Sequence, residues 1–206
     1  MSLLSVIELL AVIATAVYGI LLAVRKEMDV VGLFTVACAV SFGGGTLRDL
    51  FLDRQPLFWI AHPHLPLVVL VLAILGSVLP RVLNKLERFL LLPDALGMGL
   101  FTVAGTQYAL DAGSPWFICA LMGAITGTFG GVIGDMLCND IPSLFRPAPL
   151  NATCSFAGAG VYVLLSQLQL PGLTAAIIGV VVVFVFRLVA VRWNLQLPAV
   201  RLPDAD

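Results

Sequence analysis

Charged side chains are scarce in this sequence. Lys, Arg, Asp and Glu make up 11% of its 206 residues, whereas hydrophobic residues make up 60%. Because soluble domains carry about 25% charged residues, this shortage indicates a membrane protein rather than a soluble enzyme. The formal net charge is −1, so the chain lacks the basic surface that nucleic acid requires. We therefore expect no nucleic-acid partner and no enzymatic activity.

Clustered metal ligands and catalytic groups are also missing. The four cysteines are scattered, with no CxxC pair and no zinc-type spacing, which favours a role in packing. His62 and His64 form a short HPH stretch, but no cluster of Cys or Asp accompanies them. No serine and histidine lie within the apolar segments as the catalytic pair of an intramembrane hydrolase would. We predict no metal site, no cofactor and no catalytic residues.

Long apolar runs dominate the rest of the chain. A membrane-spanning helix needs about 20 mainly apolar residues, and seven segments are long enough. We therefore predict an all-α integral membrane protein with seven transmembrane helices, folded as one structural domain with short connections. The predicted spans cover about 3–24, 29–53, 65–83, 90–110, 115–138, 150–168 and 172–191.

Basic residues concentrate in alternate connections. Cytoplasmic connections carry an excess of Lys and Arg, which here places the N-terminus outside and the C-terminus in the cytoplasm of a multi-pass protein of the cell (inner) membrane. The outer connections then hold only Arg54, with Arg48 near that end of its span. Arg187, in the last span, is expected to extend toward the cytoplasmic face. The cytoplasmic connections hold Arg25, Lys26, Arg81, Lys85, Arg88, Arg146, Arg192 and Arg201.

The sequence contains an internal repeat. A shift of 86 residues aligns GGTLRDLFLDRQP (44–56) with GGVIGDMLCNDIP (130–142), matching two glycines, an aspartate and a proline without a gap. Each copy holds three predicted spans, an odd number, so the second copy enters the membrane in the opposite orientation. We predict an inverted repeat with units at 1–86 and 87–170, followed by a seventh span and cytoplasmic tail at 171–206. Inverted repeats are typical of transport proteins, whose pathway lies near the bilayer midplane.

Glycines gather in the middle of the second and fifth predicted spans. Non-helical backbone at membrane depth is tolerated where it lines water, so we predict that both spans break at these glycines and expose carbonyl groups to a pathway. The alternative is that the glycines only allow close packing between helices. The predicted pathway residues are Ser41, Gly43, Gly44, Gly45, Thr46, Arg48, Asp49, Thr128, Gly130, Gly131, Gly134 and Asp135.

Ionisable residues accompany both glycine clusters. Asp49 and Asp135 follow their glycines by about one helical turn, and ionisable residues within spans usually face a bundle interior or a water-filled path. Arg48 is expected to pair with Asp49, Asp53 or Asp135, or to extend outward. Glu8 and Asp94 align in the repeat and are candidate acids at the two mouths of a cation pathway. The alternative for these two is an ordinary interfacial carboxylate.

The stretches GGGTLRDLFLDRQP and FGGVIGDMLCNDIPSLF, in a chain with seven predicted spans, resemble the paired motif of prokaryotic members of the trimeric intracellular cation channel family. The resemblance implies a homotrimer in membrane lipid, with one potassium- and sodium-conducting pore per subunit lined by spans two and five. The second copy departs from the pattern, with Phe129 in place of the first glycine and Gly134 in place of the arginine. Some bacterial relatives with the same duplicated unit are linked to glycine uptake. A small-solute (glycine) transporter using the same broken-helix site is therefore the alternative function.

Overall fold

The protein is a helical bundle. The computed structural model describes residues 2–79, 83 and 89–198, and these residues contain helices and connections but no β-strand. Two short elements, α3 (Phe58–Ala61) and the 3-10 helix η2 (Ser143–Phe145), lie in connections. The long helices are α1 (Leu3–Arg25), α2 (Val30–Phe51), α4 (His64–Val78), α6 (Leu91–Asp111), α7 (Trp116–Leu137), α8 (Ala152–Gln167) and α9 (Gly172–Arg192).

Each predicted span corresponds to one of these long helices. Four of them, α1, α2, α7 and α9, are long and apolar enough to cross a membrane, and α4 is a shorter apolar helix. That all seven cross the membrane stays a prediction. The clearest difference is in the third span, where α4 ends at Val78. The boundary predicted at 86–87 lies outside the described residues, as do the basic residues Arg81, Lys85, Arg88 and Arg201.

The second helix of each repeat ends in the same way. Asp53, just after α2, has a backbone φ of 50°, and Asn139, just after α7, has a φ of 57°. Asp and Asn are among the few non-glycine residues that adopt this left-handed conformation readily. These two residues are also related by the 86-residue shift. The repeat seen in the sequence therefore extends to the backbone conformation that terminates α2 and α7.

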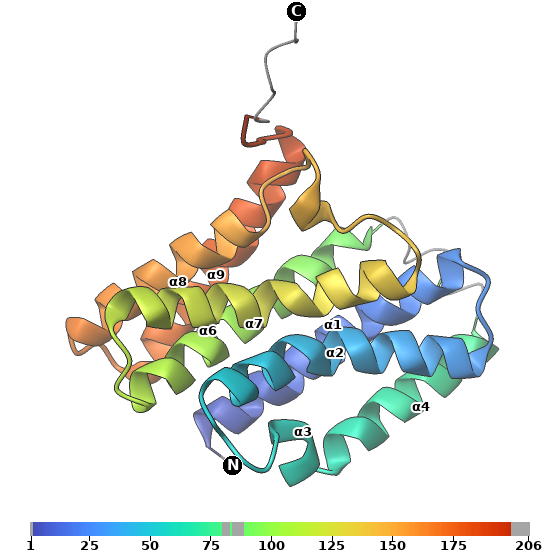
Figure 1. Ribbon diagram of the computed structural model, residues 1–206, viewed down its shortest axis with the longest axis horizontal. Coiled ribbons are helices and arrows are strands. Elements are labelled where there is room, and N and C mark those ends of the chain that lie inside the picture. Colours follow the sequence, from blue (N-terminus) through green and yellow to red (C-terminus); the bar gives the residue numbers. More distant parts are fainter. Residues whose placement is uncertain (1, 80–82, 84–88, 199–206) are drawn as a thin grey trace, which may run out of the picture.

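Helices α2 and α7 pack against each other and lie side by side in Figure 1. α1 packs on α2, and α6 packs on α7, so the first two helices of each repeat form equivalent pairs. α4 covers α1 and α2, whereas α8 packs on α6 and α7, and α9 packs on α6 and α8. In Figure 1, α2 and α7 run in opposite directions, so their C-terminal ends lie at opposite ends of the bundle.

The glycines do not break α2 or α7, contrary to the prediction from the sequence. α2 is helical throughout Val30–Phe51 and α7 throughout Trp116–Leu137. A Cβ atom on Gly44 would collide with the carbonyl oxygen of Thr126, and one on Gly130 would collide with the carbonyl oxygen of Val40. The two glycines thus let the backbones of α2 and α7 touch, which is the packing role that small residues have between membrane helices.

The outer faces of the bundle expose large apolar side chains. Leu67 and Val71 on α4 are 59% and 47% exposed, and Ile177 and Val181 on α9 are 55% and 50% exposed. An exposed apolar surface of this extent is unfavourable in water, whereas lipid tails are equally apolar. The distribution is that of a membrane protein.

A pair of neighbouring glycine variants tests the close crossing of α2 and α7. Gly130→Ala forces a methyl group against the backbone of Val40, which we expect to lower stability by about 1–3 kcal/mol. Gly131→Ala meets no atom within 4 Å, so only the higher helix propensity of alanine acts, worth about 1 kcal/mol. Thermal unfolding in mild detergent should show a lower Tm for the first variant and an equal or higher Tm for the second. The same Tm for both variants would contradict the crossing.

Candidate functional site

The first charged cluster joins α1 to the C-terminal end of α2. Its members are Glu8, Arg48 and Asp49, which are 2%, 0% and 1% exposed. Arg48 Nε donates a hydrogen bond to Asp49 Oδ1 at 2.8 Å, and Arg48 Nη1 donates to Glu8 Oε1 at 3.1 Å. Of the three partners considered for Arg48 from the sequence, the structure places Asp49 beside it. It also adds Glu8, which belongs to another helix.

Aromatic rings and a second arginine surround this cluster. The guanidinium carbon of Arg48 lies 5.0 Å from the centre of the Phe58 ring and 4.2 Å from that of Tyr108. Arg54 stacks over the same Tyr108 ring at 3.7 Å and reaches Asp49 Oδ1 at 3.5 Å. Buried charge is tolerated when it is paired and hydrogen-bonded, and cation–π contacts add to this stabilisation. Two carboxylates and two guanidinium groups therefore balance each other here.

The second charged cluster joins α6, α7 and α9. Its members are Asp94, Asp135 and Arg187. Arg187 Nε and Nη2 each donate to Asp94 Oδ2 at 3.4 Å, and Arg187 Nη1 donates to the carbonyl oxygens of Pro149 at 3.1 Å and Leu150 at 2.7 Å. That Arg187 extends toward the cytoplasmic face stays a prediction, and the structure adds that its guanidinium group is paired rather than free in solvent. A partly buried acid, Asp94, and two carbonyl groups of the α7–α8 connection hold the side chain in place.

The two clusters are equivalent in part. Glu8 and Asp94 are related by the 86-residue shift, and so are Asp49 and Asp135. Each aspartate accepts a backbone N–H from the connection that follows its helix: Asp49 Oδ2 from Phe58 at 2.8 Å, and Asp135 Oδ2 from Ser143 at 3.3 Å. In both clusters, the acid from the first helix of the repeat is paired with an arginine. Both candidate mouth acids thus lie in ion pairs, the Glu8 pair buried and the Asp94 pair partly buried.

The source of the arginine distinguishes the clusters. In the first it is Arg48 of α2, whereas the equivalent position on α7 is Gly134, where a Cβ atom would meet the Val40 side chain. The second cluster instead takes its arginine from α9, outside the repeat. Comparison of the two repeat copies could not identify Arg187 as a member of the second cluster, because Arg187 lies outside the repeat. The available signal was a charged residue in an apolar last helix, and such residues usually have a functional partner.

Several predicted pathway residues lie outside both clusters. The Ser41 hydroxyl is buried between α1 and α2, where Thr15 Oγ1 donates to it at 3.2 Å. Thr46 Oγ1 accepts a hydrogen bond from Trp59 Nε1 at 3.1 Å. A Cβ atom on Gly43 would collide with the Ile133 side chain and one on Gly45 with the Phe58 ring, and Gly43 and Thr46 also border an apolar surface hollow of about 490 Å³. The structure therefore brings Arg48 and Asp49 together in the first cluster and places Asp135 in the second, whereas Ser41 and Thr46 belong to neither.

A small cavity of about 20 Å³ adjoins the second cluster. Thr128, Gly131 and Asp135, all predicted pathway residues on α7, line it together with Asp94, Asn151 and Arg187. On the side of the first cluster, Glu8 borders a separate hollow of about 150 Å³ with His62 and His64. Within the described residues, no group of three or more His, Cys, Asp or Glu side chains is arranged to hold a metal ion.

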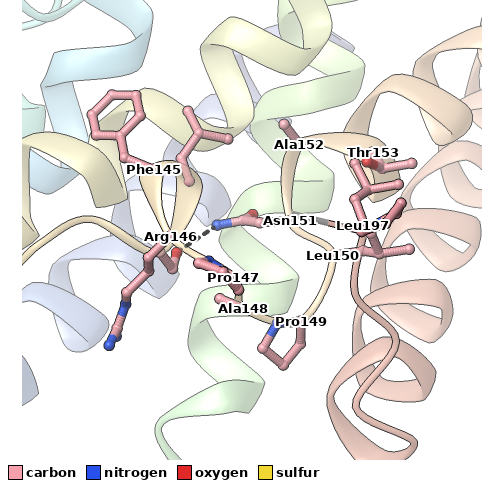
Figure 2. Close-up of a pocket in the computed structure, with 13 residues that line it drawn as sticks. Phe145, Arg146, Pro147, Ala148, Pro149, Leu150, Asn151, Ala152, Thr153 and Leu197 are labelled. Atoms are coloured by element: carbon pink, nitrogen blue, oxygen red, sulfur yellow. Dashed lines mark hydrogen bonds between the residues drawn. The ribbon is translucent and has the colours of Figure 1, made fainter. Parts of the chain in front are cut away.

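The connection between α7 and α8 forms a larger surface hollow of about 380 Å³ (Figure 2). Asn151 Nδ2 donates to Ser143 Oγ at 3.3 Å across this connection, whereas the Arg146 side chain extends away from Asn151 (Figure 2). Ser143 and Asn151 line both this hollow and the small cavity. The two spaces are therefore separated by two polar side chains.

Comparison with known proteins identifies the family. A family model described as "Glycine transporter" matches residues 5–81 and 91–167, and the second match begins 86 residues after the first. The chain belongs to this family. It is 35% identical over 199 residues to the UPF0126 inner membrane protein YadS of Escherichia coli, covering 95% of this chain and 96% of the relative. It is 34% identical over 202 residues to a UPF0126 membrane protein of Vibrio cholerae, covering 98% and 84%.

Solved structures agree with this assignment. The trimeric intracellular cation channel (TRIC) orthologue of Rhodobacter sphaeroides is 33% identical, with a TM-score of 0.87 over 95% of this chain and 100% of that chain. A structure described as "Structural basis for conductance through TRIC cation channels" is 26% identical, with a TM-score of 0.87 over 99% and 100%. These matches confirm the resemblance to prokaryotic TRIC channels and the expectation that the chain is not an enzyme.

A stability comparison tests the buried first cluster. Arg48→Gln leaves the buried Glu8 without a cation and Asp49 with only the Arg54 contact at 3.5 Å, and removing one partner of a buried ion pair costs about 3–5 kcal/mol. Arg54→Gln is the control, because its side chain is 38% exposed and exposed ion pairs contribute about 0–1 kcal/mol. Thermal unfolding in detergent should show a large loss of Tm for the first variant and a small one for the second. Equal losses would mean that Arg48 does not hold the cluster together.

Proposed function

We propose that the chain is a passive channel for monovalent cations, potassium and sodium, with one pathway inside each subunit along the contact of α2 and α7. The observation that carries this proposal is the pair of charged clusters at opposite ends of that contact. Ionisable groups inside membrane helices are expensive and mark ion pathways. Glu8, Arg48 and Asp49 are already 2%, 0% and 1% exposed within a single subunit, so the first cluster is enclosed without a neighbouring subunit, which supports a pathway within the subunit rather than between subunits.

The inner membrane and a homotrimer are the proposed setting. YadS is named an inner membrane protein, and the Rhodobacter sphaeroides relative is named a trimeric channel. The distribution of basic residues supports an N-terminus outside and a cytoplasmic C-terminus. With this orientation, the first cluster faces the outer side and the second cluster faces the cytoplasm. The inverted repeat of 1–86 and 87–170 explains why equivalent acids lie at opposite ends.

The proposed conduction route avoids the helix backbone. Because α2 and α7 are continuous, their carbonyl groups stay within helical hydrogen bonds, and side chains must provide the contacts for a cation. Arg48 fills the first cluster completely, since its side chain is 0% exposed. A cation that passes Glu8 must therefore displace the guanidinium group. Movement of Arg48 is the proposed opening step.

The alternative is a glycine transporter. The description of the family model favours it, and a cluster with both carboxylates and a guanidinium group offers partners for the two charges of a zwitterion. The cavity beside the second cluster is only about 20 Å³, which is enough for about one water molecule, and the hollow of about 150 Å³ beside Glu8 is lined by no arginine that could hold a carboxylate. Glycine needs room for both an ammonium and a carboxylate group. The space beside the second cluster therefore suits a small ion better than it suits glycine.

Flux measurements on purified protein in liposomes test the proposal. We expect potassium flux that does not saturate like a carrier, and no accumulation of labelled glycine. Gly131→Leu should strongly reduce the flux, because Gly131 lines the cavity and a larger side chain fills it. Gly160→Leu is the matched control, since Gly160 also has no atom within 4 Å of an added Cβ but does not line the cavity.

Two results would contradict the channel. Saturable uptake of labelled glycine without potassium flux would favour the transporter. Equal potassium flux in wild type, Gly131→Leu and Gly160→Leu would place the pathway elsewhere.

A further inference from the structure

The chain contains two histidines, and both lie at the end of the bundle that holds the first cluster. His62 follows α3 and His64 begins α4, with Pro63 between them. Their ring centres are 5.6 Å apart, and the ring planes are inclined at 50°. His62 is partly buried and His64 is exposed, and neither ring has a hydrogen bond or an ion pair with another described residue. Each ring therefore has a nitrogen available for a ligand.

The separation of the two rings is close to that of two ligands of one metal ion. A tetrahedral ion that binds one nitrogen of each ring at about 2.0–2.1 Å holds the ring centres about 5 Å apart. A small rotation of the side chains reaches this geometry from the observed 5.6 Å. Because the proline ring fixes the φ angle of Pro63, the backbone between the imidazoles has little freedom to lose when an ion binds.

The two rings border the hollow of about 150 Å³, together with Ser5, Glu8 and Leu65. This volume holds a metal ion and several water molecules. Within the described residues no third His, Cys, Asp or Glu is placed to bind the ion directly, so water completes its coordination. Glu8 pairs with Arg48 through Oε1, which leaves Oε2 to accept a hydrogen bond from a water molecule on the ion. Carboxylates commonly support bound metal ions in this way.

The opposite end of the bundle has a cationic side chain in the equivalent place. The 86-residue shift relates residues 62–64 to residues 148–150, and it relates Glu8 to Asp94. There the guanidinium group of Arg187 donates both to Asp94 and to two carbonyl groups of residues 148–150. Arg187 belongs to α9, outside the repeat, and no Lys or Arg side chain of the described residues lines the hollow at Glu8. The position between the acid and the connection is therefore open at this end.

We infer that His62 and His64 bind one transition-metal ion, Zn²⁺ or Ni²⁺, in the hollow beside Glu8. Imidazole nitrogen suits these ions, whereas Ca²⁺ and Mg²⁺ prefer oxygen ligands. The ion takes the position beside Glu8 that Arg187 takes beside Asp94. With two protein ligands and the rest water, it exchanges with solution, unlike a structural zinc ion that has four protein ligands.

The bound ion lowers the entry of permeating cations. Glu8 borders the hollow, and it is the acid that a cation passes on the proposed pathway. A divalent charge at this position repels a potassium ion and competes with it for the carboxylate. This consequence rests on the proposed function, whereas the metal site itself does not.

Isothermal titration calorimetry of the full chain in detergent, purified without a polyhistidine tag, tests the site. Zinc or nickel chloride should show saturable binding, whereas magnesium or calcium chloride should show none. His62→Gln and His64→Gln should each weaken the Kd by about tenfold or more, because each removes one of two protein ligands. Asp111→Asn is the control: it removes an exposed carboxylate that bonds to Gln107 outside the hollow, and it should bind as wild type does.

Histidine modification tests the same site without a substitution. Diethyl pyrocarbonate modifies accessible imidazole rings, and the chain has only these two histidines. Zinc should protect both rings from modification, as measured by mass spectrometry, whereas magnesium should not. Equal modification with and without zinc, or unchanged zinc binding in the double variant His62→Gln/His64→Gln, would overturn the inference.

Potassium flux in liposomes separates the metal site from the channel. Zinc should lower the flux of wild type but not that of the double variant. Zinc binding that depends on the histidines, in a protein that conducts no potassium, would refute the channel and leave the site. Potassium flux without zinc binding would refute the site and leave the channel intact.

Discussion

The backbone contact between α2 and α7 is the constraint on which the rest of the structure depends. Gly44 lies against the carbonyl of Thr126, and Gly130 lies against the carbonyl of Val40. The contact needs glycine from both helices, which explains why the motif occurs in both copies of the repeat. Because the helices run in opposite directions, the same contact sends Asp49 and Asp135 to opposite ends of the bundle.

This contact also determines which groups can interact with a cation. Broken helices would offer carbonyl oxygens, but α2 and α7 stay helical through their glycines. Side chains therefore carry the chemistry, and they are arranged differently at the two ends. Arg48 fills the first cluster and, together with Arg54, balances its two carboxylates, whereas the second combines a cavity with a carboxylate that lacks an ion-pair partner among the described residues. Arg187 brings α9 into contact with this second end.

The sequence allowed much of the architecture to be predicted. Apolar runs located the seven long helices, because length and hydropathy largely determine where a helix can span a bilayer. The repeat placed Asp49 and Asp135 in equivalent positions, and the structure shows the same backbone hydrogen bond at each. These features depend on local sequence or on comparison of the two copies, and both are visible in one chain.

Two features could not be predicted in this way. Glycine both weakens a helix and permits close contact, and only the position of the neighbouring helix decides between the two roles. At Gly44 and Gly130 that neighbour is a backbone, so packing prevails. The role of Arg187 depends on α9 lying against α6, which is a tertiary contact outside the repeat. Residue spacing contains no information about that contact.

Single-channel recording in planar bilayers tests the central claim, a cation pathway inside each subunit, most directly. With purified protein and a potassium chloride gradient, the account predicts unitary currents that reverse at the potential set by potassium and disappear when N-methyl-D-glucamine replaces it. Currents that reverse at the chloride potential would contradict a cation pathway. The absence of unitary currents in preparations that take up labelled glycine would contradict a channel altogether.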